Sequence, residues 1–476
     1  MGHATSRQGS YRIIALIVAS AFFMEQLDST IISTALPAMA QSLGTDPVRM
    51  NFAMTAYLLS LAAFIPISGK IADRFGTRNT FRGAITLFVV SSVLCGFAQN
   101  LPWLIGARLL QGASGAMMVP VGRLVLLRTV EKSQLVSAMS WVLFPAMIGP
   151  AVGPLIGGFL TTYLSWHWIF FINVPIGLAG IALATTYIPD IRSDAPPSSF
   201  DYLGFVLAAA TLACLIVGLE GLGHGGLSPT ALLLLGAAAA CALAYAWHSR
   251  RHADPVLDFS LMRIATFRVA MRGGFLYRVA YGSFPFLMPL MLQLGFGLSA
   301  AESGAITFAG AVGGLVMKAI SVRFLRAFGY RRVMIWNGLL SAVLLGLCGA
   351  FRPEWPLAAI YLLLLLGGLA RSLQFNAYGT IVYADVPQPR MSAATSLAST
   401  NQQMTAALGI GLAALVLDTS MRTLGHAAVQ LTDFTMAFAA MGLLGVLAVT
   451  QCRELPANAG AELSGHRRQD GAPTRG

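Results

Sequence analysis

The sequence carries ionisable side chains inside long apolar segments, where charge is costly. Asp28 lies near the middle of such a segment, and Glu25 precedes it by three residues, on the same face of a helix. A charge at the centre of a bilayer costs roughly 2.5 to 3.5 kcal/mol on insertion scales, so it persists only beside a cavity or a partner. The two carboxyl groups are therefore candidates for carrying a proton through a membrane protein.

Arg108 lies about a third of the way into another apolar segment and is the natural partner of Asp28. We expect protonation of Asp28 to break this ion pair. The site could then open to the other side of the membrane when the helix bundles rock. The alternative is a permanent pair that only holds two helices together. A proton-driven transport assay on Asp28→Asn separates the two, because unchanged coupling would exclude the carrier role.

Later apolar segments contain Arg278 and Arg371 near their middles. Tyrosines flank the first arginine, and polar residues share a helix face with the second by i+3 and i+7 spacing. We expect a polar, cationic cavity wall in the second half of the chain: Tyr277, Arg278, Tyr281, Arg371, Gln374, Tyr378 and Asn401. Such a wall indicates a neutral or anionic amphipathic substrate. The alternative is that both arginines bond helix-end carbonyls or neighbouring helices.

Snorkelling explains three cations nearer the membrane boundary: Arg123, Arg272 and Lys318.

Composition predicts the elements that position these residues. Of 476 residues, 56% are hydrophobic and only 11% are charged, against roughly 25% charged in soluble domains. The chain breaks into apolar runs of about 18 to 28 residues, long enough to cross a hydrocarbon core. We expect fourteen spans, beginning near Ile13, Asn51, Phe81, Trp103, Gln134, Trp166, Tyr202, Ser228, Phe267, Ala300, Val333, Trp355, Ala393 and Thr432.

The net charge of +12 reflects topology. Loops after even-numbered spans and the termini hold 22 of the 31 basic residues, and loops after odd-numbered spans hold three. The positive-inside rule then places both termini in the cytoplasm, and nucleic-acid binding is not implied.

A short internal repeat divides the chain. SGKIADRFGTR at 68–78 aligns with SVRFLRAFGYR at 321–331 at a constant offset of 253 residues. Parallel repeats with substrate bound between them characterise a class of secondary transporters. We expect a cytoplasmic N-terminus (1–12), an N-terminal six-helix bundle (13–187) and two inserted helices (188–250). A cytoplasmic linker (251–266), a C-terminal six-helix bundle (267–452) and a disordered cytoplasmic tail (453–476) are expected to follow. The polar stretch up to Arg12 is also expected to be disordered.

Five motifs follow one another along the predicted spans: LDSTII from Leu27 with ALP from Ala35, GKIADRFGTR from Gly69, Arg108 with QG at 111–112, GPAVGPLIGG from Gly149, and WHWIFFINVPIG from Trp166. Together they resemble the major facilitator superfamily, in its fourteen-helix drug:proton antiporter branch of the EmrB/QacA type, and are most similar to MdtD-type multidrug exporters. The resemblance implies an all-α membrane protein that exports small molecules from the cytoplasm in exchange for protons.

The loop and the glycine-rich helix have expected roles. The loop is expected to act as a cytoplasmic gate, held closed by ion pairs of its charged residues. The alternative is a solvated turn whose basic residues only set the membrane topology. The loop residues concerned are Gly69, Asp73, Arg74, Gly76 and Arg78. Glycines four residues apart allow close helix packing, and prolines bend the helix. The resemblance makes this the antiporter helix, although a merely kinked packing helix is the alternative; its residues are Gly149, Pro150, Gly153, Pro154, Gly157 and Gly158.

Other functions are excluded or left open. The five scattered cysteines predict no disulfide and no metal site, and no cofactor is expected. An ATP-driven pump and a membrane enzyme are disfavoured, because no GxxxxGK[ST], HExxH or GxSxG motif occurs. Partners are a small-molecule substrate, protons and the bilayer, and a periplasmic adaptor is left open. Alternatives are an exporter of an anionic metabolite or chelate and a membrane-embedded sensor.

Overall fold

The computed structural model describes residues 2–130, 134–189, 201–225, 228–252, 255–456 and 459–464, and every regular element in these ranges is helical. The N-terminal half contains α1 (Gly2–Ile31), η1 (Ile32–Thr34), α2 (Leu36–Ser42), η2 (Val48–Met50), α3 (Asn51–Phe64), η3 (Ile65–Ile67), α4 (Ser68–Phe75), α5 (Thr77–Gly96), α6 (Leu101–Thr129), α7 (Leu135–Tyr163), α8 (Trp168–Phe171) and α9 (Asn173–Tyr187).

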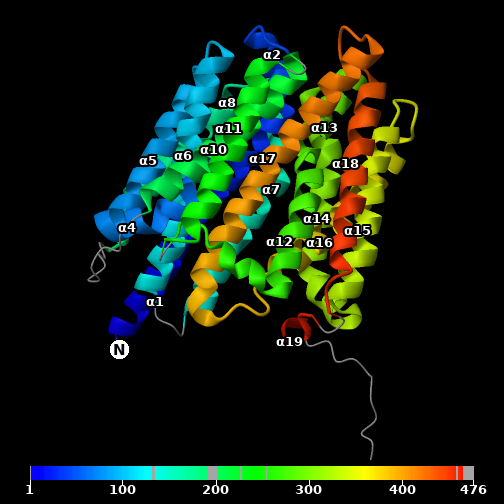
Figure 1. The fold of residues 1–476 in the computed structure, drawn as a ribbon. Helices are drawn as coiled ribbons and strands as arrows, with labels where there is room; N and C mark the ends of the chain where they lie inside the picture. Colours follow the sequence, from blue (N-terminus) through cyan, green and yellow to red (C-terminus); the bar gives the residue numbers. More distant parts are fainter. Residues whose placement is uncertain are drawn as a thin grey trace, which may run out of the picture.

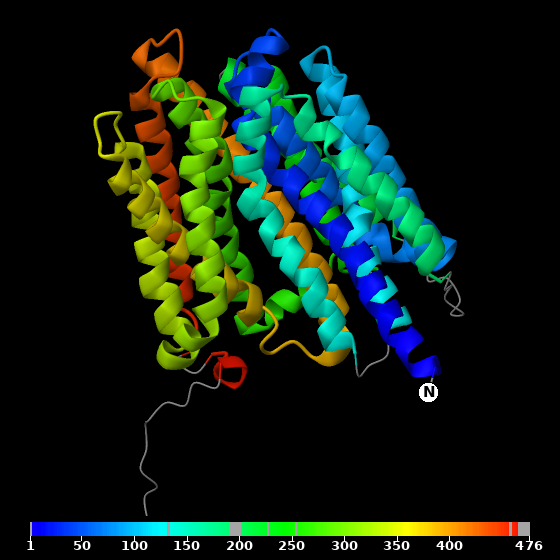
Figure 2. The same ribbon diagram turned by 180° about the vertical axis from the view of Figure 1, so that it is seen from behind.

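The inserted pair and the C-terminal half follow. They contain α10 (Tyr202–Gly225), α11 (Pro229–Ser249), η4 (Phe259–Arg263), α12 (Ala265–Gly282), α13 (Phe284–Leu290), η5 (Met291–Gly295), α14 (Ala300–Phe328), α15 (Tyr330–Leu347), η6 (Cys348–Ala350), α16 (Leu357–Ile381), η7 (Gln388–Arg390), α17 (Met391–Leu424), α18 (Leu431–Cys452) and α19 (Ala461–Ser464). Figures 1 and 2 show the long helices running side by side, with the N-terminal and C-terminal halves as neighbouring groups.

Thirteen helices of the described ranges are long and apolar enough to cross a membrane. The apolar, 29-residue α7, at the position of the fifth predicted span, packs between α1 and α14 but is not among these thirteen, so the expected count of fourteen stays a prediction. Only helices satisfy all their backbone hydrogen bonds within one apolar segment, so this composition selects an all-helical protein. The chain is a multi-pass membrane protein, and the start of α1 lies on the same side of the bundle as α19 (Figure 1).

The expectation of a disordered N-terminus is wrong, because α1 already begins at Gly2. Helix formation is cooperative, so the hydrophobic span from Ile13 extends backward through the polar stretch. In the tail, residues 461–464 form α19, and the rest of the predicted disordered segment, residues 465–476, lies outside the described residues.

The internal repeat is visible in the backbone. Gly76 joins α4 to α5 at φ +86°, and Gly329 joins α14 to α15 at φ +74°. A positive φ favours glycine, so both positions require the same residue for the same turn. The two turns lie 253 residues apart, which matches the repeat in the sequence. We call the end of the bundle that carries these turns, the start of α1 and α19 the basic end.

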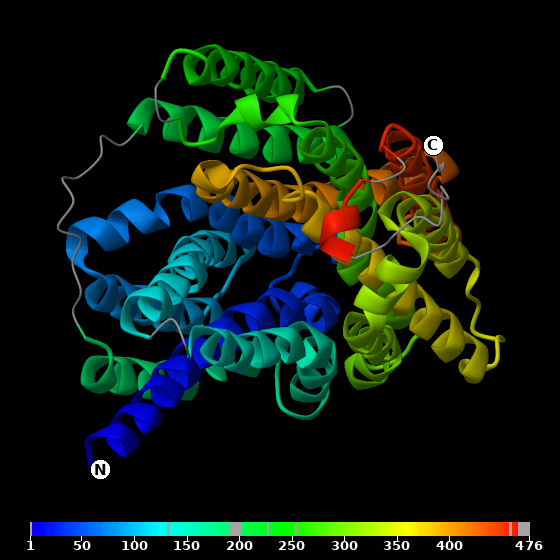
Figure 3. The same ribbon diagram turned by 90° about the horizontal axis from the view of Figure 1, so that it is seen from below.

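The inserted helices cover the junction between the two halves. Figure 3, seen from the basic end, places α10 and α11 together on the outside of the molecule. α10 packs on α3 of the first half and on α17 of the second half, and the rings of Phe64 and Phe205 lie 5.5 Å apart. The predicted insertion therefore occupies one flank and leaves the interface between the bundles to other helices.

The linker after α11 is attached to the C-terminal half by an ion pair. Arg390 Nη2 donates to Asp258 Oδ2 at 2.6 Å and also contacts Ser260. Burial alone would raise the pKa of Asp258, but the hydrogen bonds from Ser260 and Arg390 outweigh it and hold that pKa below its ordinary value. A lowered pKa keeps the carboxylate ionised at neutral pH, and its stabilising contribution is lost only when strong acid protonates it.

Candidate functional site

A buried polar network surrounds Asp28 in the N-terminal half. Arg108 Nη1 lies 2.6 Å from Asp28 Oδ2, and neither residue is exposed to solvent. The other carboxylate oxygen accepts hydrogen bonds from Gln111 Nε2 at 2.8 Å and from Asn173 Nδ2 at 2.9 Å. The network joins α1, α6 and α9, so three of the recognised motifs meet at one carboxylate.

Arg108 is fixed by further contacts. Its Nε donates to the carbonyl of Ala53 at 2.9 Å, and Nη1 also donates to Gln111 at 2.7 Å. Its guanidinium lies 4.3 Å from the centroid of the Tyr57 ring. A buried ion pair is stabilised when additional hydrogen bonds satisfy both ions. Here hydrogen bonds satisfy the Asp28 carboxylate and the Nε and Nη1 atoms of Arg108, whereas Arg108 Nη2 is buried without a partner among the described residues. The predicted pairing of Asp28 and Arg108 is present in this state.

Glu25 is placed very differently, although it lies only one turn before Asp28. Its side chain lines the central cavity, is 4% exposed, and its Oε2 is buried without a hydrogen-bond partner among the described residues. The hydroxyl of Tyr57 donates to the backbone carbonyl of Glu25 at 3.5 Å. On the facing helix, a Cβ added to Gly115 would lie 3.5 Å from Glu25 Cγ, so the neighbouring surface is close. The Oε2 atom of this carboxyl group thus has no donor among the described residues, although the Tyr57 hydroxyl also interacts with the carboxyl group.

The central cavity lies between the two halves and has a volume of about 470 Å³. It is lined by α1, α3 and α7 of the first half and by α12, α13, α14, α16 and α17 of the second half. This volume falls in the range of small-molecule sites in proteins. Both halves contribute polar groups, as expected for a site between two repeats.

The structure divides the residues predicted for the cationic wall into two groups. Arg278, Tyr281 and Arg371 line the cavity. Four others do not line it and pack elsewhere in the C-terminal half, which corrects the prediction for them: Tyr277, Gln374, Tyr378 and Asn401. Asn401 is 5% exposed, and its Nδ2 has no partner among the described residues.

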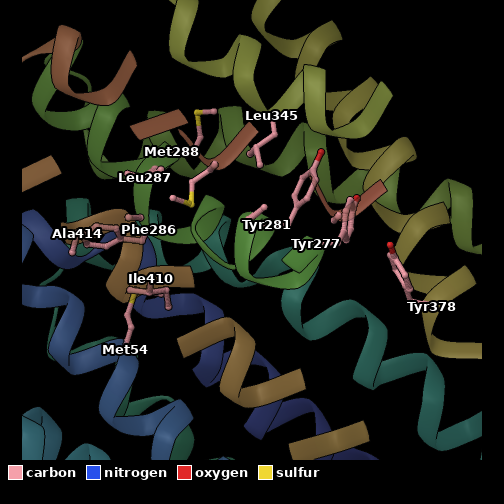
Figure 4. Packing of buried hydrophobic residues seen from close by; sticks show 14 of the residues in the cluster. Met54, Tyr277, Tyr281, Phe286, Leu287, Met288, Leu345, Tyr378, Ile410 and Ala414 are labelled. Carbon is pink, nitrogen blue, oxygen red and sulfur yellow. The ribbon is translucent and has the colours of Figure 1, made fainter. Parts of the chain in front are cut away.

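The displaced residues bond to neighbouring helices. The Tyr277 hydroxyl lies 2.5 Å from Ser341 Oγ of α15, and the Tyr378 hydroxyl lies 3.1 Å from Cys452 Sγ of α18. Gln374 Nε2 donates to the carbonyl of Met334 at 3.0 Å. Figure 4 shows Tyr277 and Tyr281 as neighbours with Tyr378 beyond them, and the Tyr277 ring lies 5.0 Å from Tyr281 and 5.7 Å from Tyr378. These residues form a packed polar layer behind the cavity.

Other lining residues were not assigned from the sequence. Lys318, which we attributed to snorkelling, lines the cavity from α14 with an exposed side chain. Three side-chain amides near predicted positions also line it: Asn376, Gln402 and Gln403. On α16 the lining positions are 371, 372, 375 and 376, which is one helix face. Gln402 and Gln403 directly follow Asn401 in the sequence, and they line the cavity whereas Asn401 does not.

The cavity is electrostatically polarised. Glu25 is the acidic residue of its described lining and belongs to the first half. The second half contributes three cations, Arg278, Arg371 and Lys318. The Arg278 guanidinium lies 5.9 Å from the Phe375 ring centroid, and that of Arg371 lies 5.5 Å from the Phe284 ring centroid. Aromatic faces favour a cation without neutralising it, so the positive charge remains available to a ligand.

The glycine-rich helix α7 packs tightly on two sides. A Cβ added at Gly157 would lie 2.2 Å from the carbonyl oxygen of Ile31 on α1, and Gly149 and Gly153 face α1 in the same way. Gly158 faces the other half, where an added Cβ would lie 2.3 Å from the carbonyl oxygen of Ala300 on α14. Pro150 and Pro154 line the cavity. The helix therefore contacts its own bundle and the opposite one.

The α7–α14 contact lies at the end opposite the basic end. There, a Cβ at Gly304 would lie 2.3 Å from the Pro154 carbonyl oxygen, and the Ala301 amide donates to Thr162 Oγ1 at 3.0 Å. Gln293 Nε2 also donates across the halves to the Thr34 carbonyl at 3.0 Å. Figure 2 shows α7 and α14 close at this end and diverging toward the basic end.

The predicted gate loop forms a contact within its own half. Arg128 Nη2, near the end of α6, lies 2.7 Å from Asp73 Oδ1, and both side chains are partly exposed. Gly76 forms the turn, an added Cβ at Gly69 meets nothing within 4 Å, and the Arg74 guanidinium lies 5.5 Å from the Phe75 ring centroid. Arg78 is the second residue of α5, and its Nε is buried without a partner among the described residues.

The fold and the polarised cavity between two repeated halves define a membrane transporter. The sequence profile of the Major Facilitator Superfamily matches residues 18–247 and 271–463, and the chain belongs to this family. It is 39% identical over 403 residues to a putative multidrug resistance protein MdtD of Cronobacter sakazakii, covering 84% of this chain and 85% of the relative. The corresponding protein of Klebsiella pneumoniae is 39% identical over 415 residues, covering 87% and 88%.

Solved structures share the fold at low sequence identity. A D-xylose-proton symporter superposes with a TM-score of 0.67 at 15% identity, covering 94% of this chain and 98% of the symporter. The human organic anion transporter MFSD10 (TETRAN) superposes with a TM-score of 0.62 at 14% identity, covering 93% and 99%. These likenesses confirm the predicted all-helical major facilitator fold.

Proposed function

We propose that this transporter is a proton-coupled antiporter that exports small amphipathic molecules or drugs across the cytoplasmic membrane. The observation that carries the proposal is the Glu25 carboxyl group, which is buried, lacks a partner for Oε2 and lines the cavity between the halves. A proton-coupled transporter needs a group that binds and releases a proton where the substrate also binds. The relatives named as multidrug resistance proteins support export of drugs.

In the proposed proton cycle Glu25 gains and loses the proton, while the Asp28–Arg108 pair stays formed. A buried carboxyl oxygen without a donor is less costly in the neutral acid than in the anion, so Glu25 holds a proton while its surroundings stay dry. Opening of the cavity to the cytoplasm hydrates the carboxyl group and lets the proton leave. Asp28 remains paired with Arg108 and keeps α1, α6 and α9 together through the cycle.

Alternating access follows from the contacts between the halves. The basic end faces the cytoplasm by the positive-inside rule, with both termini inside. The α7–α14 contact then closes the periplasmic end, and its backbone-to-backbone approach needs glycine. Rocking of the halves would separate α7 from α14 there and close the cytoplasmic end, where the gate loop pairs Asp73 with Arg128 in the present state.

Gly304→Leu is expected to weaken the closed periplasmic end. The new side chain meets the carbonyl of Pro154, and overpacking of this kind costs about 1 to 3 kcal/mol, which shifts the equilibrium by roughly 5- to 150-fold. Transport should fall, and a cysteine introduced by Ala301→Cys in a cysteine-free background should react faster with an impermeant maleimide. Gly236→Leu is the control, because its added Cβ meets nothing within 4 Å. Equal reactivity in both variants would contradict the assignment.

The polarity of the cavity indicates the substrate. One carboxyl group that is neutral when protonated faces three cations, so the cavity favours a neutral or anionic amphiphile over a lipophilic cation. The same observation favours a second candidate, the export of an anionic metabolite or chelate. Both candidates share the cytoplasmic orientation and the proton site, and they differ only in what the cations recognise.

Arg371→Gln and Lys318→Gln are expected to reduce transport of an anionic amphiphile by about tenfold or more, because each removes a charge-assisted contact of about 1.5 to 3 kcal/mol. Transport of a neutral amphiphile of similar size should change much less. Arg123→Gln, an exposed cation of α6, is the matched control. A wild-type profile confined to lipophilic cations would contradict this substrate assignment.

The proposal is tested with the purified protein in proteoliposomes under an imposed pH gradient. Cationic, neutral and anionic fluorescent amphiphiles are assayed in turn, and internal pH is followed with a trapped dye. We expect substrate to move against the proton gradient and each substrate pulse to move protons the other way. Substrate movement without a proton response would exclude antiport, and no response to any compound would favour the sensor alternative.

A further inference from the structure

Three potential metal ligands meet at the basic end of the inserted helices, away from the central cavity. Asp201 lies immediately before α10, His248 lies in the last turn of α11, and His252 follows that helix. One ligand atom from each side chain lies within 4.8 Å of the other two. Two imidazoles and one carboxylate are a ligand set that divalent transition metals prefer.

The two histidines are held on one face by the backbone. The His252 amide donates to the His248 carbonyl at 3.0 Å, which continues the helical pattern one turn beyond α11. The ring centroids lie 5.2 Å apart with an interplanar angle of 37°. Histidines four residues apart on a helix present their rings in the same direction, which is the spacing of many zinc sites.

Asp201 is oriented toward this pair by main-chain donors. Its Oδ1 accepts from the Gly204 amide at 2.8 Å, and its Oδ2 accepts from the Val256 amide at 3.4 Å. The residue is 3% exposed, and His248 Nε2 lies 2.6 Å from Oδ1. Hydrogen bonds that fix the direction of a carboxylate are typical of ligands supported by an outer shell. The carboxylate therefore sits in a set position beside two imidazoles.

We propose that Asp201, His248 and His252 bind a divalent transition metal ion, with Zn²⁺ as the expected occupant and water as a fourth ligand. Ligand atoms around tetrahedral zinc lie about 3.4 Å apart, so the widest pair here must close by at most about 1.4 Å and the His248–Asp201 pair, now 2.6 Å apart, must open slightly, which rotation of the two half-buried imidazole rings provides. The metal would lie between His248 Nε2 and Asp201 Oδ1, in place of their direct contact. Arg250 and Arg251 are the nearby cations in sequence, and Arg251 stacks on Trp247 at 3.9 Å.

A bound ion would fasten three segments at once. Asp201 lies just before α10, and the two histidines lie at and just after the end of α11. The Val256 amide, which donates to Asp201, belongs to the linker that leads to the Asp258–Arg390 pair in front of α17. The inserted helices pack on both halves through α10. Metal binding should therefore stiffen the linker where it joins the C-terminal half.

The test uses full-length protein in detergent, with any affinity tag removed and with ZnCl₂ or CoCl₂ as the only added metal. Wild type should bind one equivalent by titration calorimetry, give the visible absorption of tetrahedral Co²⁺, and melt at a higher temperature with Zn²⁺ than with a chelator. His252→Gln and Asp201→Asn should each weaken binding by about tenfold or more. His252 is the safer substitution, because it is the less buried of the two.

His426→Gln is the matched control. His426 Nδ1 lies 2.9 Å from Asp433 at the opposite end of the protein, so it is also an Asp–His pair, but no further histidine joins it among the described residues. Its metal affinity should equal that of wild type. Hydrogen exchange of the Val256 and Leu257 amides should slow with Zn²⁺ in wild type and not in His252→Gln. Absence of binding by wild type, or equal binding by His252→Gln, would overturn the proposal without affecting the proposed antiport.

Discussion

Arg108→Ala is expected to destabilise the folded protein by about 3 to 5 kcal/mol and to abolish transport. The substitution leaves the Asp28 carboxylate buried without its counter-ion, and removing one partner of a buried pair costs this much. Gln111 and Asn173 would remain on Asp28 Oδ1 but bring no charge. The melting temperature of the purified protein, followed by tryptophan fluorescence, measures the loss.

Two comparisons make this prediction specific. Arg123→Ala removes an exposed arginine from the same helix and should leave the melting temperature nearly unchanged. Asp28→Asn combined with Arg108→Gln removes both charges while keeping hydrogen-bonding groups, so it should recover most of the lost stability. An unchanged melting temperature in Arg108→Ala would contradict a structural pair and would favour the switching role first considered for Asp28.

The sequence predicts the spans well because membrane insertion imposes a simple physical rule. An apolar run of sufficient length must be a helix, since no water is present to bond its backbone. The predicted start near Ala393, for example, coincides with the start of the candidate span Ala393–Leu424. The repeat was also readable, because Gly76 and Gly329 occupy turns whose positive φ constrains the residue type.

The cavity wall was predicted only in part, for a physical reason. Helical spacing shows that Arg371 and Tyr378 share a face, but it does not show which neighbour that face meets. The Tyr378 ring lies against Gly273 and Gly274 of α12, where the missing side chains admit it. Arg371 points instead into the space between the halves. To predict which of these two residues lines the cavity, one must know how α12 packs on α16. The spacing of residues along one helix does not give that information.

Depth in the membrane does not by itself predict the roles of Lys318 and Glu25. Lys318 is close enough to the boundary to snorkel, yet it belongs to the cavity lining. Asp28 is deeper and more costly than Glu25, which made it the stronger proton candidate in the sequence. The structure places partners around Asp28 and leaves Glu25 Oε2 without one among the described residues. Depth measures the cost of a charge, whereas partners decide whether the charge is free to change.

Glu25→Gln is expected to uncouple transport from the proton gradient while preserving the fold. The amide cannot exchange a proton, but it fills the same space, so stability should change by no more than about 1 kcal/mol. A difference of one pH unit supplies about 1.4 kcal/mol per proton, which is about tenfold in the steady-state substrate ratio. Wild type should show this dependence in proteoliposomes, and Glu25→Gln should give the same ratio with and without the gradient.

Exchange of labelled for unlabelled substrate distinguishes uncoupling from general damage. This exchange needs only binding and rocking, so it should continue in Glu25→Gln at a rate near that of wild type. Glu354→Gln, an exposed carboxylate in the loop before α16, should leave both assays unchanged. If Glu25→Gln still responds to the gradient while Asp28→Asn exchanges substrate without responding, Asp28 carries the proton and its pairing with Arg108 must open during the cycle. If neither variant loses the response, the transported proton uses another route.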